Sequence, residues 1–158
     1  MIRPWLLAAL LCLGPNLGAQ PLPAGVRLGM GVDELRQVQP SVERVRRPER
    51  LAGGLAGSWR LDHSELASLS GAQLFFFAGG QLRRVEFQVD EASDATFERL
   101  LAWGRQQYGT ERPAQDAVSR YAAWSTVDTD IYLRLLTSSR PGLSLVLSAR
   151  PPRDDRTL

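Results

Sequence analysis

The sequence predicts an α+β fold, in which two main helices cover one face of an antiparallel sheet of about six strands. Two segments with helical start and stop signals, residues 32–39 and 94–108, are each followed by three runs rich in β-forming residues. A Gly-Gly pair joins two of these runs and is typical of a tight hairpin between antiparallel strands. The order therefore indicates a tandem pseudo-repeat of one α-β-β-β unit.

The first helix is predicted from the stretch LGMGVDELRQVQP, residues 28–40. Gly31 is the expected N-cap, and the Glu34 carboxylate can reach back to the Gly31 N–H as half of a capping box. Met30 and Leu35 occupy the two positions of a hydrophobic staple. Pro40 disfavours helical geometry in the residue before it, so the helix ends there. Because a helix of about two turns is unstable alone, these signals predict that it docks on the sheet.

A hairpin at residues 72–89, AQLFFFAGGQLRRVEFQV, is the clearest strand signal. Residues 26–28 and 55–61 are also expected to be strands, and the arginine-rich segment 41–54 a loop or frayed helix. The Gly79-Gly80 turn pairs Phe77 with Leu82, Phe75 with Arg84 and Leu74 with Val85. One face of the hairpin then carries Leu74, Phe76, Val85, Phe87 and Val89, and the other carries Phe75, Phe77, Leu82, Arg84 and Glu86.

The second helix is predicted at residues 94–108, after a cap at Ser93 or Asp94. Gly109 fits the position after the helix, where left-handed backbone geometry is common. An apolar stripe follows the helical period: Phe97, Leu100, Leu101, Gly104 and Tyr108. Three further strands are expected at 121–127, 130–136 and 143–149, and in the last of them leucines alternate with Ser144, Val146 and Ser148.

One domain is expected to span residues 20–150, with half-repeats at about 26–90 and 93–150. Each half carries a tryptophan on its first strand, Trp59 and Trp124, ahead of an apolar hairpin. A domain of this length can build a core from its own chain. Residues 151–158 are charged and proline-rich, and they are expected to form a flexible tail.

Residues 1–19 are predicted to be a secretory signal peptide. Arg3 supplies the positive charge at its start, an apolar run over residues 5–13 follows, and Ala19 is a small residue at the expected cleavage point. The apolar run is shorter than the roughly 20 residues that span a bilayer. The sequence therefore predicts a periplasmic or secreted protein. Lipid attachment at Cys12 is an open alternative, although Leu11 precedes it where such sites carry a small residue.

Charge and cysteine content argue against several classes of function. All 19 basic residues are arginine, against 17 acidic residues. Without Arg3, 18 arginines remain and the net charge is +1, which argues against nucleic acid as a partner. Cys12 is the only cysteine and would leave with the signal peptide, so no disulfide is expected. No second apolar run is long enough for a membrane span.

No catalytic or metal-binding set is predicted. The only histidine, His63, lies between Asp62 and Ser64, but neighbours on a strand point to opposite faces and cannot form a catalytic relay. Two groups of carboxylates lie close in sequence without the glycine-bent loop of a calcium site: Asp90, Glu91 and Asp94, and Asp128 and Asp130. We therefore expect no enzyme activity, no cofactor and no metal.

The stretch Leu28-Gly29-Met30, followed by Asp33, Glu34 and Leu35, resembles a helix-start motif of small exported bacterial proteins. Two such families are the SmpA/OmlA-type outer-membrane assembly lipoproteins and the tandem-repeat β-lactamase inhibitor proteins. The resemblance implies helices on one face of an antiparallel sheet and a non-enzymatic role. It covers about a tenth of the chain and departs from these families at Gly31, where they usually have Ser or Thr. It implies no catalytic residue.

A partner-binding surface is predicted on the sheet face that the helices leave open. If the helices cover the face with Phe76, Val85 and Phe87, the opposite face carries an exposed apolar patch rimmed by polar groups, which usually marks a binding site. Its expected members are Phe75, Phe77, Leu82, Arg84, Tyr132 and Arg134, with Ser144 and Ser148 as further candidates. The lead residues 20–28 or a loop would be the alternative cover of this face.

The arginine cluster Arg44, Arg46, Arg47 and Arg50 is a second candidate, for anion binding or partner docking, because guanidinium groups bind carboxylates and phosphates. A solvated loop is the simpler interpretation of the same cluster.

Together these features predict an exported, non-enzymatic interaction module, of inhibitor or envelope-accessory type, with a protein partner in the cell envelope or outside the cell. The alternative is a carrier that holds a small apolar or anionic ligand in the concavity of the sheet. A deep apolar pocket would favour the carrier, and a broad patch would favour the protein partner. An unrecognised hydrolase ranks last.

Overall fold

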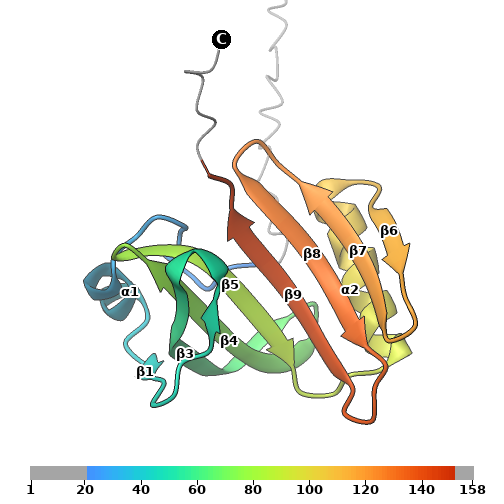
Figure 1. Cartoon of the computed structure of the whole chain (residues 1–158), viewed down its shortest axis with the longest axis horizontal. Helices are drawn as coiled ribbons and strands as arrows, with labels where there is room; N and C mark the ends of the chain where they lie inside the picture. Colours follow the sequence, from blue (N-terminus) through green and yellow to red (C-terminus); the bar gives the residue numbers. More distant parts are fainter. Residues whose placement is uncertain (1–20, 152–158) are drawn as a thin grey trace, which may run out of the picture.

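Residues 21–151, the part of the chain that the structure describes, form a nine-stranded antiparallel sheet and two α-helices in the computed structural model (Figure 1). The strands follow the order β1-β3-β4-β5-β9-β8-β7-β6, and β2 pairs with β3 off this path. The elements are α1 (Val32–Val38), β1 (Glu43–Arg44), β2 (Arg50–Leu51), the 3-10 turn η1 (Ala52–Gly54), β3 (Leu55–Leu66), β4 (Leu69–Ala78), β5 (Gln81–Val89), α2 (Asp94–Tyr108), β6 (Arg112–Gln115), β7 (Ser119–Ser125), β8 (Thr129–Leu136) and β9 (Gly142–Ala149). The predicted signal peptide and residues 152–158 of the predicted tail lie outside the described residues.

The expected sheet of about six strands is wrong, since the described residues form nine. The additional strands β1, β2 and β6 have two, two and four residues, and none of these residues is buried. No apolar alternation therefore marks them in the sequence. The expected strand at 26–28 is also wrong. This segment turns, and it joins the start of β5 by bonds from the Gly29 N–H to the Leu82 carbonyl (2.7 Å) and from the Leu82 N–H to the Met30 carbonyl (2.8 Å).

Two three-stranded meanders, β3-β4-β5 and β7-β8-β9, build most of the sheet, and a helix comes before each in the chain. Their last strands, β5 and β9, pair in the middle of the sheet, where Val85 lies opposite Leu147. Trp59 and Trp124 lie on the first strands of the two meanders. The short strands β1, β2 and β6 are additions to this double unit, next to its outer strands β3 and β7.

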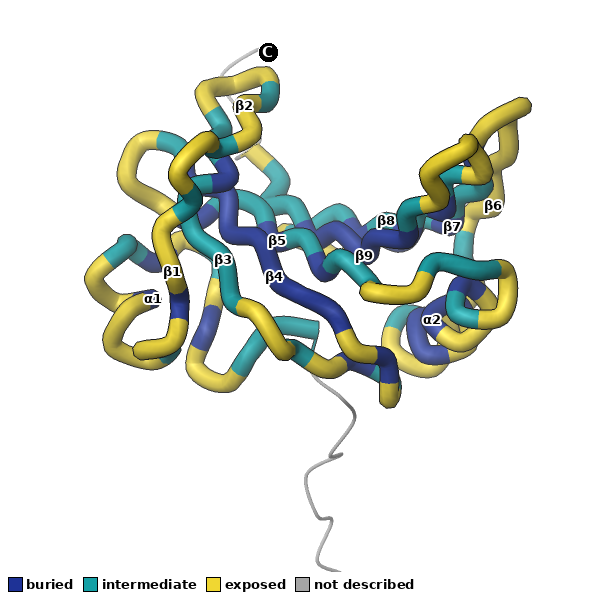
Figure 2. Tube along the Cα trace, turned by 90° about the horizontal axis from the view of Figure 1, so that it is seen from below, coloured by how far each residue is buried: buried dark blue, intermediate teal, exposed yellow. Residues whose placement is uncertain are grey.

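Both helices lie on the same face of the sheet, and each packs on its own apolar cluster (Figure 2). From α1, Leu35 joins a cluster with Phe75, Phe77, Leu82 and Val85 of the first meander. The cluster under α2 extends over both meanders and consists mainly of Phe97, Leu100, Leu101, Trp103, Phe87, Trp124, Ile131, Leu133, Leu145 and Leu147. The pairing register places these strand residues on one side of the sheet.

The sheet is bent into a trough, with both helices on its outer side (Figure 2). The segment around β2 rises at one rim of the trough, and β6 with β7 rises at the other. We call the inner surface of the trough the concave face. Within residues 21–151, no helix covers the concave face.

The start of α1 depends on burial rather than on a side-chain cap. Gly31 is the N-cap as predicted, but no side chain bonds there, so the predicted half capping box is wrong. Glu34 forms an ion pair with Arg27 instead, at 3.1 Å. Met30 and Leu35, the predicted staple pair, are 2% and 0% exposed and belong to the same cluster. Since the helix has only seven residues, this apolar docking is what keeps it folded.

The packing of α2 on the sheet depends on the absence of a side chain at Gly104. A Cβ at this position would lie 2.4 Å from Cη2 and 2.6 Å from Cζ2 of Trp124. The Trp124 indole N–H donates to the Gly109 carbonyl at 2.9 Å, which restrains the ring. Gly104 therefore lets the helix approach the tryptophan closely.

We predict that Gly104→Ala lowers the free energy of unfolding by about 1–3 kcal/mol, because overpacking exceeds the roughly 1 kcal/mol gain in helix propensity. Urea unfolding followed by circular dichroism measures this change. Gln106→Ala, at an exposed position of the same helix, is the control and should leave stability nearly unchanged. A Gly104→Ala variant as stable as the wild type would contradict the close contact with Trp124.

Candidate functional site

The concave face has a narrow floor along β9 between two rows of longer side chains. The pairing register places one residue each of β5, β9 and β8 side by side across the sheet, in three sets: Arg84, Ser148 and Asp130; Glu86, Val146 and Tyr132; and Gln88, Ser144 and Arg134. In each set the residue from β9 has the smallest side chain. The β5 and β8 side chains therefore stand as walls on either side of β9.

Arg84 crosses this floor. Its guanidinium carbon lies 5.4 Å from the centre of the Phe76 ring and 5.5 Å from the centre of the Tyr132 ring. Because β9 lies between β5 and β8, an arginine of β5 reaches Tyr132 only by passing over β9, and Val146 of β9 is 1% exposed. Cation–π contacts of this kind contribute about 0.5–2 kcal/mol each. The Phe76–Arg84–Tyr132 stack thus forms a low ridge across the floor.

The charge of Arg84 is neutralised within the face. Its Nη2 donates to Glu86 Oε2 at 3.2 Å, and both side chains are largely buried. Glu86 also accepts a longer bond from Gln88 Nε2 at 3.4 Å. Arg84 Nε is buried and has no hydrogen-bond partner among residues 21–151, so the stack rather than a full set of hydrogen bonds positions this guanidinium.

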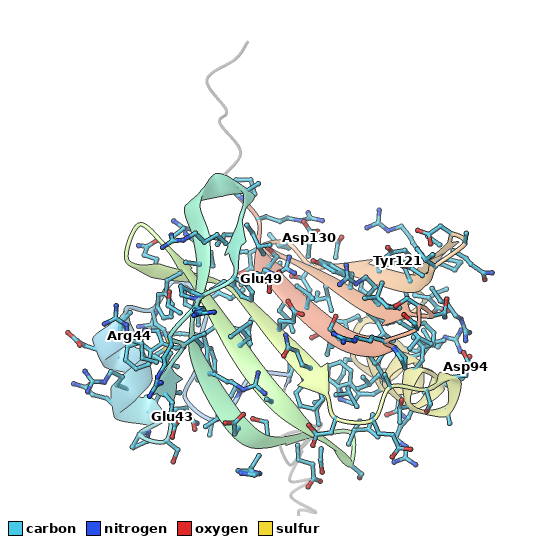
Figure 3. The ribbon with its side chains drawn as sticks, turned by 60° about the horizontal axis from the view of Figure 1, so that its bottom comes forward. Glu43, Arg44, Glu49, Asp94, Tyr121 and Asp130 are labelled. Carbon is cyan, nitrogen blue, oxygen red and sulfur yellow. The ribbon has the colours of Figure 1, made fainter. Side chains whose placement is uncertain are left out.

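Asp130 forms a second neutralised group at the far corner of the face. It accepts from Arg150 Nε at 2.8 Å and from the Ser125 hydroxyl at 2.9 Å, and Arg112 Nη2 bonds the same hydroxyl at 3.2 Å. The bond from Arg150 holds the pKa of the Asp130 carboxyl below its ordinary value. Asp130 and Tyr121 mark the β7–β8 side of the face in Figure 3.

Arg134 differs in its charge pairing from Arg60, Arg84 and Arg150 of this face. Within residues 21–151 it forms no ion pair, whereas Arg60 pairs with Asp62, Arg84 with Glu86, and Arg150 with Asp130. It is half-buried, and it lies opposite Tyr121 of β7 and Ser144 of β9. Three guanidinium groups on or beside the concave face therefore have no ion pair within residues 21–151: Arg134 at the polar end, Arg83 at the bulge of β5, and Arg112, which bonds the Ser125 hydroxyl.

Two hollows open on the concave face, one at each end of the β9 floor. The polar hollow has about 230 Å³, and its polar lining residues are Glu86, Gln88, Arg134 and Ser144, beside Val89, Leu136, Gly142 and Leu143. The apolar hollow has about 620 Å³, and most of its lining is small or aliphatic: Ala52, Gly53, Leu55, Ala78, Gly79, Ala149 and Pro151, with Arg83 and Ser148. Both are open surface depressions rather than enclosed cavities.

The structure divides the predicted open-face residues between the two sides of the sheet. Arg84, Tyr132 and Arg134 lie on the concave face, as do Ser144 and Ser148. The expected placement of Phe75, Phe77 and Leu82 there is wrong. They are 0%, 8% and 0% exposed, and they pack under α1 on the opposite side.

A β-bulge at Arg83 explains this error. The Phe77–Leu82 pair is as predicted, but Phe76, not Phe75, lies opposite Arg84, because one residue of β5 has no counterpart on β4. Beyond the bulge, Val85 pairs with Phe75 rather than with Leu74. A shift by one residue moves every following side chain to the other face.

The arginine cluster forms an exposed arm on and between β1 and β2. Arg44, Arg46, Arg47 and Arg50 are all exposed, and within the described part of the chain none of them forms an ion pair. Glu43 and Arg44 lie beside α1 at the edge of the sheet (Figure 3). Their interleaving with Glu43 and Glu49 leaves the arm with only a modest excess of positive charge.

His63 lies away from the concave face, at a bulge of β3 with a positive φ of 56°. It is exposed beside a groove of about 600 Å³ that Leu22, Ala24, Gln39 and Gln73 also line. In residues 21–151 it makes no hydrogen bond to a nucleophile or a carboxylate, and no three acidic, histidine or cysteine side chains converge as metal ligands. No helix in that range is long and apolar enough to cross a membrane.

Comparison with known proteins matched the chain to no protein-family model, no curated protein and no solved structure.

We predict that Phe75→Ala and Tyr132→Ala differ sharply in their effect on stability. Phe75→Ala should lower the free energy of unfolding by about 3–5 kcal/mol, because it opens a cavity under α1. Tyr132→Ala removes a partly buried ring and one cation–π contact, and should cost less than about 2 kcal/mol. Chemical denaturation of both variants is the measurement. Equal losses would contradict the assignment of the two faces.

Proposed function

We propose that the protein is an exported, non-enzymatic interaction module that binds a protein partner with its concave face. The observation that carries this proposal is a sheet face that both helices leave open and whose central side chains contact one another in a cation–π stack and an ion pair. The Phe76–Arg84–Tyr132 stack holds its centre in place. A surface held rigid before binding loses little entropy when it docks.

The composition of the face supports a protein partner. Tyrosine and arginine are among the residues most enriched at the energetic centres of protein interfaces, and Tyr121, Tyr132, Arg84 and Arg134 lie together here. The Arg84–Glu86 ion pair is largely shielded from solvent, so a partner would not have to desolvate these two charges as isolated ions.

A small-molecule carrier is the less favoured function. Sites for small ligands usually enclose most of the ligand surface. The apolar hollow, at about 620 Å³, is large enough for a small molecule, but it is an open depression at one end of the trough. A protein segment that continues along the trough would cover this hollow and the rest of the face together.

We expect capture from cell-envelope and secreted fractions to depend on the concave face. A Tyr132→Ala/Arg134→Ala double variant should lose, by about tenfold or more, a protein that the wild type captures. Arg99→Ala, on the exposed side of α2, is the matched control and should capture it as the wild type does. Both variants must first unfold at the wild-type denaturant concentration. If every captured protein is insensitive to the double variant, or nothing is captured, the proposal is wrong.

Export is tested separately by the N-terminus of the native protein. We expect the chain recovered from the periplasm or the medium to begin at Gln20, because signal peptides are cut after a small residue. Mass spectrometry of the intact protein measures this. A chain that keeps Met1 and remains in the cytoplasm would contradict export, and a lipid-modified chain that begins at Cys12 would contradict cleavage after Ala19.

A further inference from the structure

The two hollows of the concave face differ in chemistry and have a defined spacing. The polar hollow lies at Ser144 and the apolar hollow at Ser148, on the same side of β9. Four residues of extended chain separate these positions, which corresponds to about 13 Å. The ridge formed by Arg84 and Tyr132 lies between them. A ligand that fills both hollows must therefore cross the ridge and span this distance.

The polar hollow is built for an anion. Arg134 brings a guanidinium without an ion pair among the described residues, and Ser144, only 8% exposed, brings a hydroxyl beside it. The Glu86 carboxylate in the same lining already accepts from Arg84 and Gln88. A carboxylate from a ligand would pair with Arg134 by charge-assisted hydrogen bonds, whereas an ammonium group would face an unpaired positive charge.

The apolar hollow fits an aliphatic side chain. Ala52, Leu55, Ala78, Ala149 and Pro151 form most of its wall. Covering such a surface with a Leu or Ile side chain removes apolar area from water on both partners.

The width of the trough selects the conformation of the ligand. The strands β5 and β8 are two strand spacings apart, about 9.6 Å, and side chains stand on both. A helix with side chains is about 10–12 Å wide and would rest on top of these walls. An extended chain is narrow enough to lie between them, with alternate side chains pointing to the floor.

We infer that the concave face takes an extended segment of its protein partner, with a carboxylate side chain in the polar hollow at Arg134 and an aliphatic side chain four residues away in the apolar hollow. This inference rests on the proposed function, and it names the chemistry of the partner at that site.

The test uses fluorescein-labelled nonapeptides and the purified exported protein. One pair of peptides carries Glu and Leu four positions apart, in either order, in a background of Ser and Thr. Matched peptides replace Glu by Gln or by Lys, or place Leu two positions away. Fluorescence anisotropy measures binding. For one of the two orders we expect binding that weakens by about tenfold or more with Gln, Lys or the shorter spacing.

Two variants of the protein assign each end of the peptide to its hollow. Arg134→Gln should abolish the preference for Glu over Gln, while Arg134→Lys should retain part of it. Ala52→Gln, in an exposed turn at the rim of the apolar hollow, should weaken the Leu peptide and leave the Glu preference intact. Arg99→Gln, on the outer side of α2, is the matched charge control and should change nothing.

Several results would overturn the inference. Equal binding of the Glu, Gln and Lys peptides, or no binding of any, would exclude the acidic and aliphatic pair. Self-association lost in Arg134→Gln would make a second copy of the chain the occupant. A truncation after Pro151 that raises peptide affinity by about tenfold would make the chain's own last residues the occupant. If the peptides fail while the Tyr132→Ala/Arg134→Ala variant still loses its captured protein, the inference is wrong and the proposed function stands.

Discussion

The assignment of every surface in this protein depends on the β-bulge at Arg83. Leu82 pairs with Phe77 and Arg84 with Phe76, so β5 changes phase by one residue at this point. The change brings Val85 and Phe87 to the same side as Leu82, under the helices, and places Arg84 and Glu86 on the concave face. Without the bulge, the side of β5 that carries Leu82 would also carry Arg84 and Glu86 toward the core, where two charged groups are costly to desolvate.

The strand β9 also contributes to both faces of the sheet. Its leucines Leu143, Leu145 and Leu147 are 2%, 0% and 5% exposed on the helix side. The residues that alternate with them, Ser144, Val146 and Ser148, are small and form the floor on the other side. The alternation along one strand therefore builds both the core of the second meander and the base of the trough. Because β9 also pairs with β5, it joins the two halves of the sheet in the middle of the concave face.

The helices and strands with a strong apolar period could be predicted from the sequence. The face of the sheet on which each residue of β5 lies could not, because it depends on the bulge. Both helices, the Gly79-Gly80 hairpin and the last three strands lie close to their expected positions, because capping residues, a turn pair and apolar periods mark them directly. The strands β1, β2 and β6 have no apolar period and exist only through pairing with β3 and β7. The bulge did leave a trace, since apolar residues at 82, 85, 87 and 89 break a period of two between the first and second. Such a break can mark either a turn residue or a bulge. The two are distinguished only by knowing which residues of β4 pair with β5.

The arginines of the exposed arm and those of the concave face differ in exposure and in ion pairing, so we expect them to act differently on a partner. The arm with Arg44, Arg46, Arg47 and Arg50 is exposed, so salt screens its field over about 8 Å at physiological ionic strength. It can accelerate the approach of an acidic partner but contributes little discrimination once contact is made. On the concave face, by contrast, Arg84 is committed to Glu86 and Arg150 to Asp130, whereas Arg134 has no ion pair within residues 21–151 and is the group with which we propose that a partner's carboxylate pairs. A half-buried guanidinium between fixed neighbours distinguishes a carboxylate from its amide far better than an exposed one, because the wrong partner leaves it desolvated and unpaired.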